Sequence, residues 1–181
     1  PKLFVIFGLM RNVYDTQDPK ELLKLKRLEA DSLLDVLRTI NSSEIGIERL
    51  CKIAMNVLRA QLGVKQVTFF YEYEGTWLEG MRLGFEKMEL NAIEELLHFK
   101  KITKVTAGFA PALHEMGSEY VIPILSRTEP SAYFIIANFA DSDIEVQNDL
   151  IFIATIGNIL NVAIRNRQLI EEKVQQEYLK R

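Results

Sequence analysis

The chain has 181 residues, and 48% of them are hydrophobic. That length suffices for one sizeable core and is too short for two ordinary domains. A formal net charge of -3, with basic residues interspersed among acidic ones, argues against a nucleic-acid-binding surface, which needs a cationic face. The lone cysteine, Cys51, cannot form an internal disulfide, which fits a reducing compartment, and we expect a cytoplasmic location.

Both ends of the sequence look cut from a longer protein, since it opens at Pro1 and its last residues still have a helical pattern. The apolar run Leu3 to Met10 is too short to span a bilayer, which takes roughly 20 residues. We therefore expect no membrane span in this chain. Arg11 leaves open that the run is the cytoplasmic end of a truncated transmembrane helix. The alternative, a strand or helix packed on its neighbours, is the more usual role of such a run.

Two helices are predicted before the first strand. After an N-terminal segment, residues 1–19, an amphipathic helix over residues 20–41 has an apolar stripe with a seven-residue repeat. The stripe consists of Leu23, Ala30, Leu33, Leu37 and Ile40. Asn41 to Ser43, followed by Glu44, predicts the N-terminal cap of a second helix, and Gly63 predicts its end after Leu62.

The middle of the chain changes to the pattern of strands, and its last part returns to a helix. The predicted segments are the strands 64–73 and 76–83 joined at Glu74-Gly75, a helix at 89–99, a strand at 102–106, an ordered loop at 107–118, and strands at 119–125 and 131–139. The last two strands are almost continuously apolar, which predicts that both faces of the sheet are covered. A final helix begins near Asp143, turns polar beyond Arg165 and is expected to protrude.

Five segments carry a resemblance to a known family: the helix-to-strand junction 60–64, the strand 67–71, Val121-Ile122-Pro123-Ile124, the strand 133–138 and the closing helix 159–166. With these segments and this order of elements, the chain resembles the GAF family over about residues 41–169. The resemblance implies an α+β, three-layer fold of the profilin-like and PAS-like kind. The expected antiparallel sheet of five or six strands has the terminal helices on one face and a pocket covered by loops and a helix on the other. We place the sensor domain at 42–165 and a linker helix at 166–181.

The candidate chemistry is sparse, and a non-enzymatic role is expected. Cys51 has no second thiol to resolve it, whereas the free methionine sulfoxide reductases of the GAF family depend on several cysteines. His98 and His114 are not at metal-ligand spacing. The cysteine of bilin-binding relatives and the signature of cyclic-nucleotide-binding relatives are both missing. A small-molecule enzyme such as that reductase remains the alternative function, and no cofactor is predicted.

Strand alternation suggests a ligand pocket. If one face of the first two strands looks toward the loop, an apolar and aromatic cleft results. Its candidate residues are Val67, Phe69, Tyr71, Trp77, Met81, Phe109, His114 and Tyr120. The alternative is that these side chains fill the space themselves, as aromatic stripes in cores usually do.

The resemblance implies a regulatory module of a bacterial signalling protein. It would sense a small ligand or mediate dimerisation, and a homodimer through the terminal helices is expected. The stretch Arg167 to Arg181 resembles linkers that lead into serine phosphatases of the stress-sigma-factor regulatory type, histidine kinases or diguanylate cyclases. A covalently linked effector is thus the expected partner.

Overall fold

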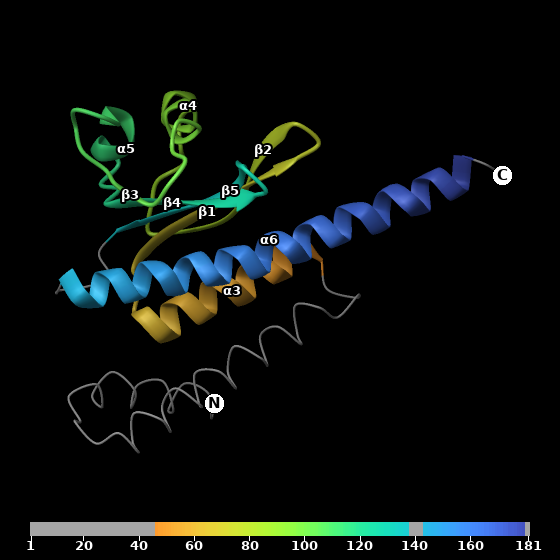
Figure 1. The fold of residues 1–181 in the computed structure, drawn as a ribbon, viewed down its shortest axis with the longest axis horizontal. Helices are drawn as coiled ribbons and strands as arrows, with labels where there is room; N and C mark the ends of the chain where they lie inside the picture. The colour runs from red at the N-terminus through yellow and green to blue at the C-terminus, as the bar shows by residue number, and fades with distance from the viewer. Residues whose placement is uncertain (1–45, 138–142, 180–181) are drawn as a thin grey trace, which may run out of the picture.

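Five antiparallel strands form one sheet with the spatial order β2-β1-β5-β4-β3. The computed structural model describes residues 46–137 and 143–179, with the side chains of the last helix described from Val146. Helices α3 and α6 cover one face of the sheet, and α4 and α5 lie over the other (Figure 1). The predicted helix at 20–41, its seam and the N-terminal segment lie outside the described residues.

Helix α3, Ile47–Leu62, matches the second predicted helix. Its buried residues recur at helical spacing, and Gly63 ends it in the left-handed conformation with φ 62°, donating its amide to the Arg59 carbonyl. The cap expected at Asn41 to Ser43 lies outside the described residues. Gly46 occupies the N-cap position and offers no side-chain hydrogen bond.

Strands β1, Gln66–Tyr73, and β2, Thr76–Leu83, form the predicted hairpin. The two turn residues, Glu74 and Gly75, have φ values of 49° and 76°, as a tight two-residue hairpin turn requires. A β-bulge interrupts the pairing, because Phe69 lies opposite Met81 while Phe70 lies opposite Glu79. The bulge shifts the alternation of side chains along β2.

The segment between the hairpin and the last two strands is mostly loop. It contains α4, Leu90–Leu96, the two-residue strand β3, Thr103–Lys104, and the short helix α5, Pro111–Glu115. Strand β3 is shorter than predicted, since only Thr103 and Lys104 pair with β4. Helix α5 falls inside the stretch 107–118, which the sequence predicted as an ordered loop.

Strands β4, Tyr120–Ser126, and β5, Glu129–Ala137, confirm the prediction of a sheet covered on both faces. From Ser131 to Ala137 every residue of β5 is buried. Pro123 sits within β4, although proline cannot donate to a ladder. It is tolerated because pairing with β3 ends at Val121, so the side of Pro123 away from β5 has no strand against it.

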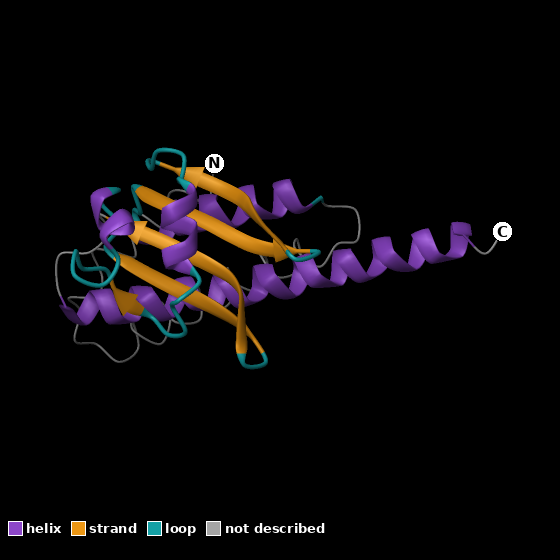
Figure 2. Cartoon of the chain, turned by 90° about the horizontal axis from the view of Figure 1, so that it is seen from above, coloured by secondary structure: helices purple, strands orange, loops and turns teal. Residues whose placement is uncertain are grey.

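Helix α6, Asp143–Leu179, is 37 residues long and has two different halves. The first half packs on the sheet and on α3, and the second extends past the sheet toward the C-terminus (Figures 1 and 2). From residue 169 onward every described side chain is exposed. The prediction that the polar end of the helix protrudes is confirmed.

The sheet separates two hydrophobic cores. The helix-side core lies between the sheet and helices α3 and α6, and includes Leu58, Phe69, Ile122, Phe134 and Ile156. The loop-side core lies under α4 and α5, and includes Phe70, Leu96, Leu113, Tyr133 and Ile135.

One buried polar contact fixes α6 on the sheet. The amide of Asn161 donates to the hydroxyl of Ser131 at 2.9 Å, and that hydroxyl lies 3.4 Å from the carbonyl oxygen of Ile124. Asn161 and Ser131 are 5% and 4% exposed, so separating them would leave polar groups without water or partner. The contact therefore defines where along its axis α6 meets β5.

Gly157 allows α6 to approach the sheet closely. A Cβ at this position would overlap the side chain of Ile124 and lie 3.0 Å from the ring of Phe134. Alanine favours a helix over glycine by about 1 kcal/mol. Overpacking a tight core costs about 1–3 kcal/mol, so the clash should outweigh that gain.

We predict that Gly157→Ala lowers the free energy of unfolding by up to about 2 kcal/mol, the overpacking cost less the gain in helix propensity. Denaturant unfolding monitored by circular dichroism measures it. The neighbouring, exposed Asn158 provides the matched control, since Asn158→Ala should be neutral or slightly stabilising. A Gly157→Ala variant more stable than wild type by about 1 kcal/mol, the helix-propensity gain alone, would contradict the close approach.

Candidate functional site

The structure does not bring the eight predicted pocket residues together. Val67, Phe69, Tyr71 and Met81 belong to the helix-side core, so the expectation that they face the loop is wrong. Because β1 is buried on both faces, its alternating pattern does not identify which face meets the loops. Their side chains fill the space under α3 and α6.

Trp77 lies on the opposite face from Met81. It packs against the loop-side core, with its ring 5.2 Å from that of Tyr133. Regular alternation would put Trp77 and Met81 on the same face, and the bulge between them reverses one of the two. This is the physical reason that the sequence grouped them incorrectly.

The remaining three candidates are dispersed. Phe109 is 59% exposed and meets Phe99 edge to face at 5.2 Å. His114 is an exposed residue of α5. Tyr120 packs against the helix-side core, and the Lys104 ammonium lies 5.9 Å from the centre of its ring, within the range of a cation–π contact. Only Trp77, Phe109 and His114 therefore remain on the loop-covered side.

A cleft of about 540 Å³ opens on the loop-covered side, where β1 begins and β2 ends. It lies between the segment that follows β2 and the helices α4 and α5. The lining residues are Gln66, Gly84, Phe85, Glu86, Lys87, Glu89, Asn91, Ala92, Ala112, Glu115 and Met116. None of the eight predicted residues is among them, and the sequence patterns that we used did not point to this cleft.

Glu95 fastens one wall of this cleft to the other. Its carboxylate, on α4, accepts hydrogen bonds from the backbone amides of Ala112 at 3.0 Å and Leu113 at 3.1 Å, at the start of α5. These amides have no partner within the helix, and a carboxylate satisfies them well. The spacing of α4 and α5, and with it the width of the cleft, depends on this side chain.

Two buried hydroxyl groups have no hydrogen-bond partner among the described residues. They belong to Thr68 of β1 and to Ser118, which follows α5. Thr68 lies two residues along β1 from Gln66, which lines the cleft, and so points to the same face of the sheet. Its unpaired hydroxyl is an interior polar group near the cleft that a ligand or a water could satisfy.

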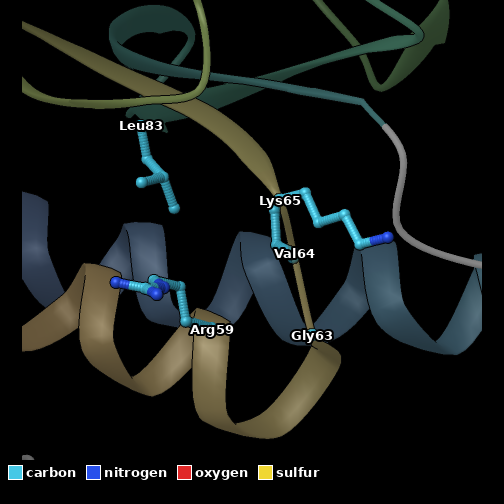
Figure 3. A pocket seen from close by; sticks show the side chains of 5 residues that line it. All are labelled: Arg59, Gly63, Val64, Lys65 and Leu83. Atoms are coloured by element: carbon cyan, nitrogen blue, oxygen red, sulfur yellow. The ribbon is translucent and has the colours of Figure 1, made fainter.

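A second, smaller pocket of about 310 Å³ lies at the end of α3 (Figure 3). Arg59, Gly63, Val64, Lys65 and Leu83 line it. Two cations could suggest an anion site, but Figure 3 shows the Arg59 and Lys65 side chains extending in opposite directions. Both residues are exposed, which is the normal state of solvated surface cations.

Cys51 is held as a buried, protonated thiol. It has no exposed surface, and its sulfur lies against Gly80, where a Cβ would come within 2.8 Å of it. Burial raises the pKa of the thiol from 9.0 to about 12. The thiolate is the reactive form, so this environment suppresses nucleophilic and redox chemistry.

We predict that a disulfide reagent labels Cys51 far more slowly in the folded protein than in denaturant. Three pKa units correspond to about a thousandfold less thiolate at neutral pH.

The same shift in the pKa of Cys51 makes stability depend on pH. The thiol keeps its proton in the folded state and loses it in the unfolded state, so the free energy of unfolding should fall as pH rises above about 9. Cys51→Ala should reduce this fall, and native labelling at the unfolded rate would contradict the assignment.

Groups that could hold a metal are missing from the described part of the chain, where His, Cys, Asp and Glu never gather three or more together.

Helix α6 is long and apolar enough between Val146 and Leu179 to cross a membrane, by length and composition only. In the structure, 44% of its most apolar stretch is buried against the fold. Core helices of globular domains meet the same two criteria, so length and composition alone assign no membrane span.

No family model matches the chain, and no curated protein matches it. Solved structures do. The GAF domain of a protein assigned as a sensor histidine kinase from Pseudomonas syringae pv. tomato superposes with a TM-score of 0.60 at 12% identity, covering 88% of this chain and 99% of the other. The A. aeolicus nlh2 GAF domain, in an inactive state, gives 0.60 at 16% identity, with coverages of 78% and 98%.

The chain has the GAF fold. A third structure agrees, the GAF domain of an Acinetobacter phosphoenolpyruvate-protein phosphotransferase, with a TM-score of 0.51 at 16% identity and coverages of 79% and 96%. At such identities the likeness concerns the fold alone. It confirms the α+β class and the sheet with helices on both faces that the resemblance implied.

Proposed function

We propose that this GAF domain is a non-catalytic sensory or regulatory module that passes its state to a linked effector through α6. The single observation behind this proposal is that one unbroken helix is both a core element and an exposed output. Ile153, Ile156 and Leu160 are buried in the helix-side core, while the same helix continues past the sheet to Leu179. A change in how the sheet holds α6 must therefore displace the exposed half.

The similar structures support this role by what their names state. One is assigned to a sensor histidine kinase and another to a phosphotransferase, so in both the GAF domain belongs to a larger protein. A histidine kinase, a serine phosphatase or a cyclase would each accept a helix as its input. The cleft beside α4 and α5 is the place that we propose for a small ligand, because it is concave and is lined by both polar and apolar residues.

An enzymatic role has less support. The one thiol, Cys51, is buried in the helix-side core, away from the cleft. The free methionine sulfoxide reductase activity left open by the sequence would need a reactive thiol at a pocket. The cleft itself presents carboxylates and one lysine without a nucleophile beside a base.

Helix insertions test the output mechanism. We would fuse the chain to the catalytic core of a histidine kinase and insert residues between Glu172 and Lys173. Each residue turns a helix by about 100°, so two residues rotate the output by about 200° and seven return it to within about 20°. With two added residues, autophosphorylation should be lost, or its on and off states should be exchanged. With seven added residues, it should return to the level of the fusion without an insertion.

The control for this series is a seven-residue glycine-serine insertion at the same place, which has the same length but breaks the helix. It should behave unlike the helical seven-residue insertion. Equal activity at every insertion length would show that α6 is a passive tether, and the proposed function would lose its mechanism.

We further propose that two copies form a homodimer through an apolar stripe on the projecting half of α6. Ile170, Val174 and Tyr178 recur at four-residue spacing and are 48%, 46% and 74% exposed. Exposed apolar residues on one face of a protruding helix are typical of a helical seam between two copies.

We predict that Ile170→Glu combined with Val174→Glu shifts the chain toward monomer at micromolar concentration, as measured by light scattering. The matched control, Arg165→Gln with Gln176→Glu, makes the same change of net charge at exposed positions on another face of the helix. It should leave the mass unchanged. A wild-type chain that is strictly monomeric would contradict the proposed homodimer.

A further inference from the structure

The end of the β1–β2 hairpin contacts α6 where the helix leaves the core. The Tyr73 hydroxyl donates to the Glu171 carboxylate at 3.3 Å, and the side-chain amide of Gln168 donates to the carbonyl oxygen of Glu72 at 3.3 Å. Gln168 and Glu171 lie three residues apart and so share a face of the helix. Two neighbouring residues of one strand thus bind one face of the projecting helix.

The hairpin end is well suited to act as a rigid arm. The Glu72 carboxylate accepts the amide of Gly75 at 2.6 Å, which closes the turn from within. Glu74 and Gly75 already have the positive φ values that this turn needs. A displacement of β2 would therefore move Glu72 and Tyr73 as a unit.

The two faces of this arm meet the two cores. Tyr73 packs against the helix-side core, and Trp77 packs against the loop-side core on Tyr133. Trp77 is the cross-strand partner of Glu72, the residue that binds Gln168. A rearrangement of the loop-side core can thus reach α6 by tilting the hairpin, without passing through the helix-side core.

The hairpin contact differs in kind from the buried polar contact between α6 and β5. The pair of Asn161 and Ser131 is buried, so breaking it leaves groups unsatisfied and the joint stays closed. The contacts of Gln168 and Glu171 lie at or near the surface, where water replaces a lost partner at little cost. The contact of Asn161 with Ser131 therefore stays formed, whereas the contacts of Gln168 and Glu171 are weak enough to break and form again.

We propose that the hairpin end is a releasable clamp on α6, which sets the direction of the projecting half and opens when the loop-side core rearranges. This deepens the proposed function by assigning the joint at which the output helix is regulated. The clamp residues are Glu72, Tyr73, Gln168 and Glu171.

Amide hydrogen exchange on the full 181-residue chain tests the clamp. Tyr73→Phe combined with Gln168→Ala removes both donors while keeping the ring and the helix. Exchange of the amides of residues 169–179 should become about fivefold faster, as expected for losing two weak contacts. Residues 150–164, held by the core and by Asn161, should exchange at their wild-type rates.

The chain supplies a matched control on the same helix. Gln175→Ala makes the same amide-to-alanine change at an exposed position outside both the clamp and the dimer stripe. It should leave exchange of residues 169–179 unchanged. Equal exchange in wild type, test variant and control would overturn the clamp, and so would a uniform increase over the whole helix, since that would report general destabilisation.

Fluorescence of Trp77, the only tryptophan, tests the connection to the loop-side core. Releasing the clamp should increase quenching of Trp77 by acrylamide about 1.5-fold or more, because the freed hairpin exposes the ring more often. Unchanged quenching together with faster exchange would overturn the connection. Neither measurement uses an effector, so failure of the clamp is distinguishable from failure of the helix insertions that test the proposed function.

Discussion

Burial of the central strands on both faces is the constraint on which the rest of the fold depends. Strands β1 and β5 lie in the middle of the sheet, and every residue of β5 from Ser131 to Ala137 is buried. Two layers must cover such strands, since one layer would leave an apolar face in water. The long helices cover one face and the short helices the other, which makes α6 an integral part of the core.

Much of the fold could be predicted because the apolar residues recur at the spacing of a helix or of a strand along most elements. The helical spacing before Gly63 gave α3, and the apolar runs around Pro123 and Tyr133 gave two adjacent buried strands. Strand β3 was overestimated, because a short edge strand has too few residues to establish a period. The protruding half of α6 was predictable because the sequence changes from mostly apolar to mostly polar near Arg165.

The candidate site could not be predicted to the same degree, for two physical reasons. A strand that is buried on both faces is apolar on both, so its sequence does not show which face meets the loops. For this reason Phe69 and Tyr71 were assigned to the wrong face. The bulge at Gly80 is a property of strand pairing, and it separated Trp77 from Met81. The cleft depends on Glu95 reaching α5, a contact between residues 17 and 18 positions apart that no local pattern encodes.

The proline in β4 also bears on how copies of this domain can meet. Open sheet edges invite pairing with other chains, and proteins that stay soluble disrupt them. Pro123 removes a donor from the open side of β4, β3 is only two residues long, and β2 at the other edge carries the bulge at Gly80. Neither border of the sheet offers a straight template for strand addition. Association between copies is thereby directed away from sheet extension, and amyloid-like stacking of the native domain is disfavoured.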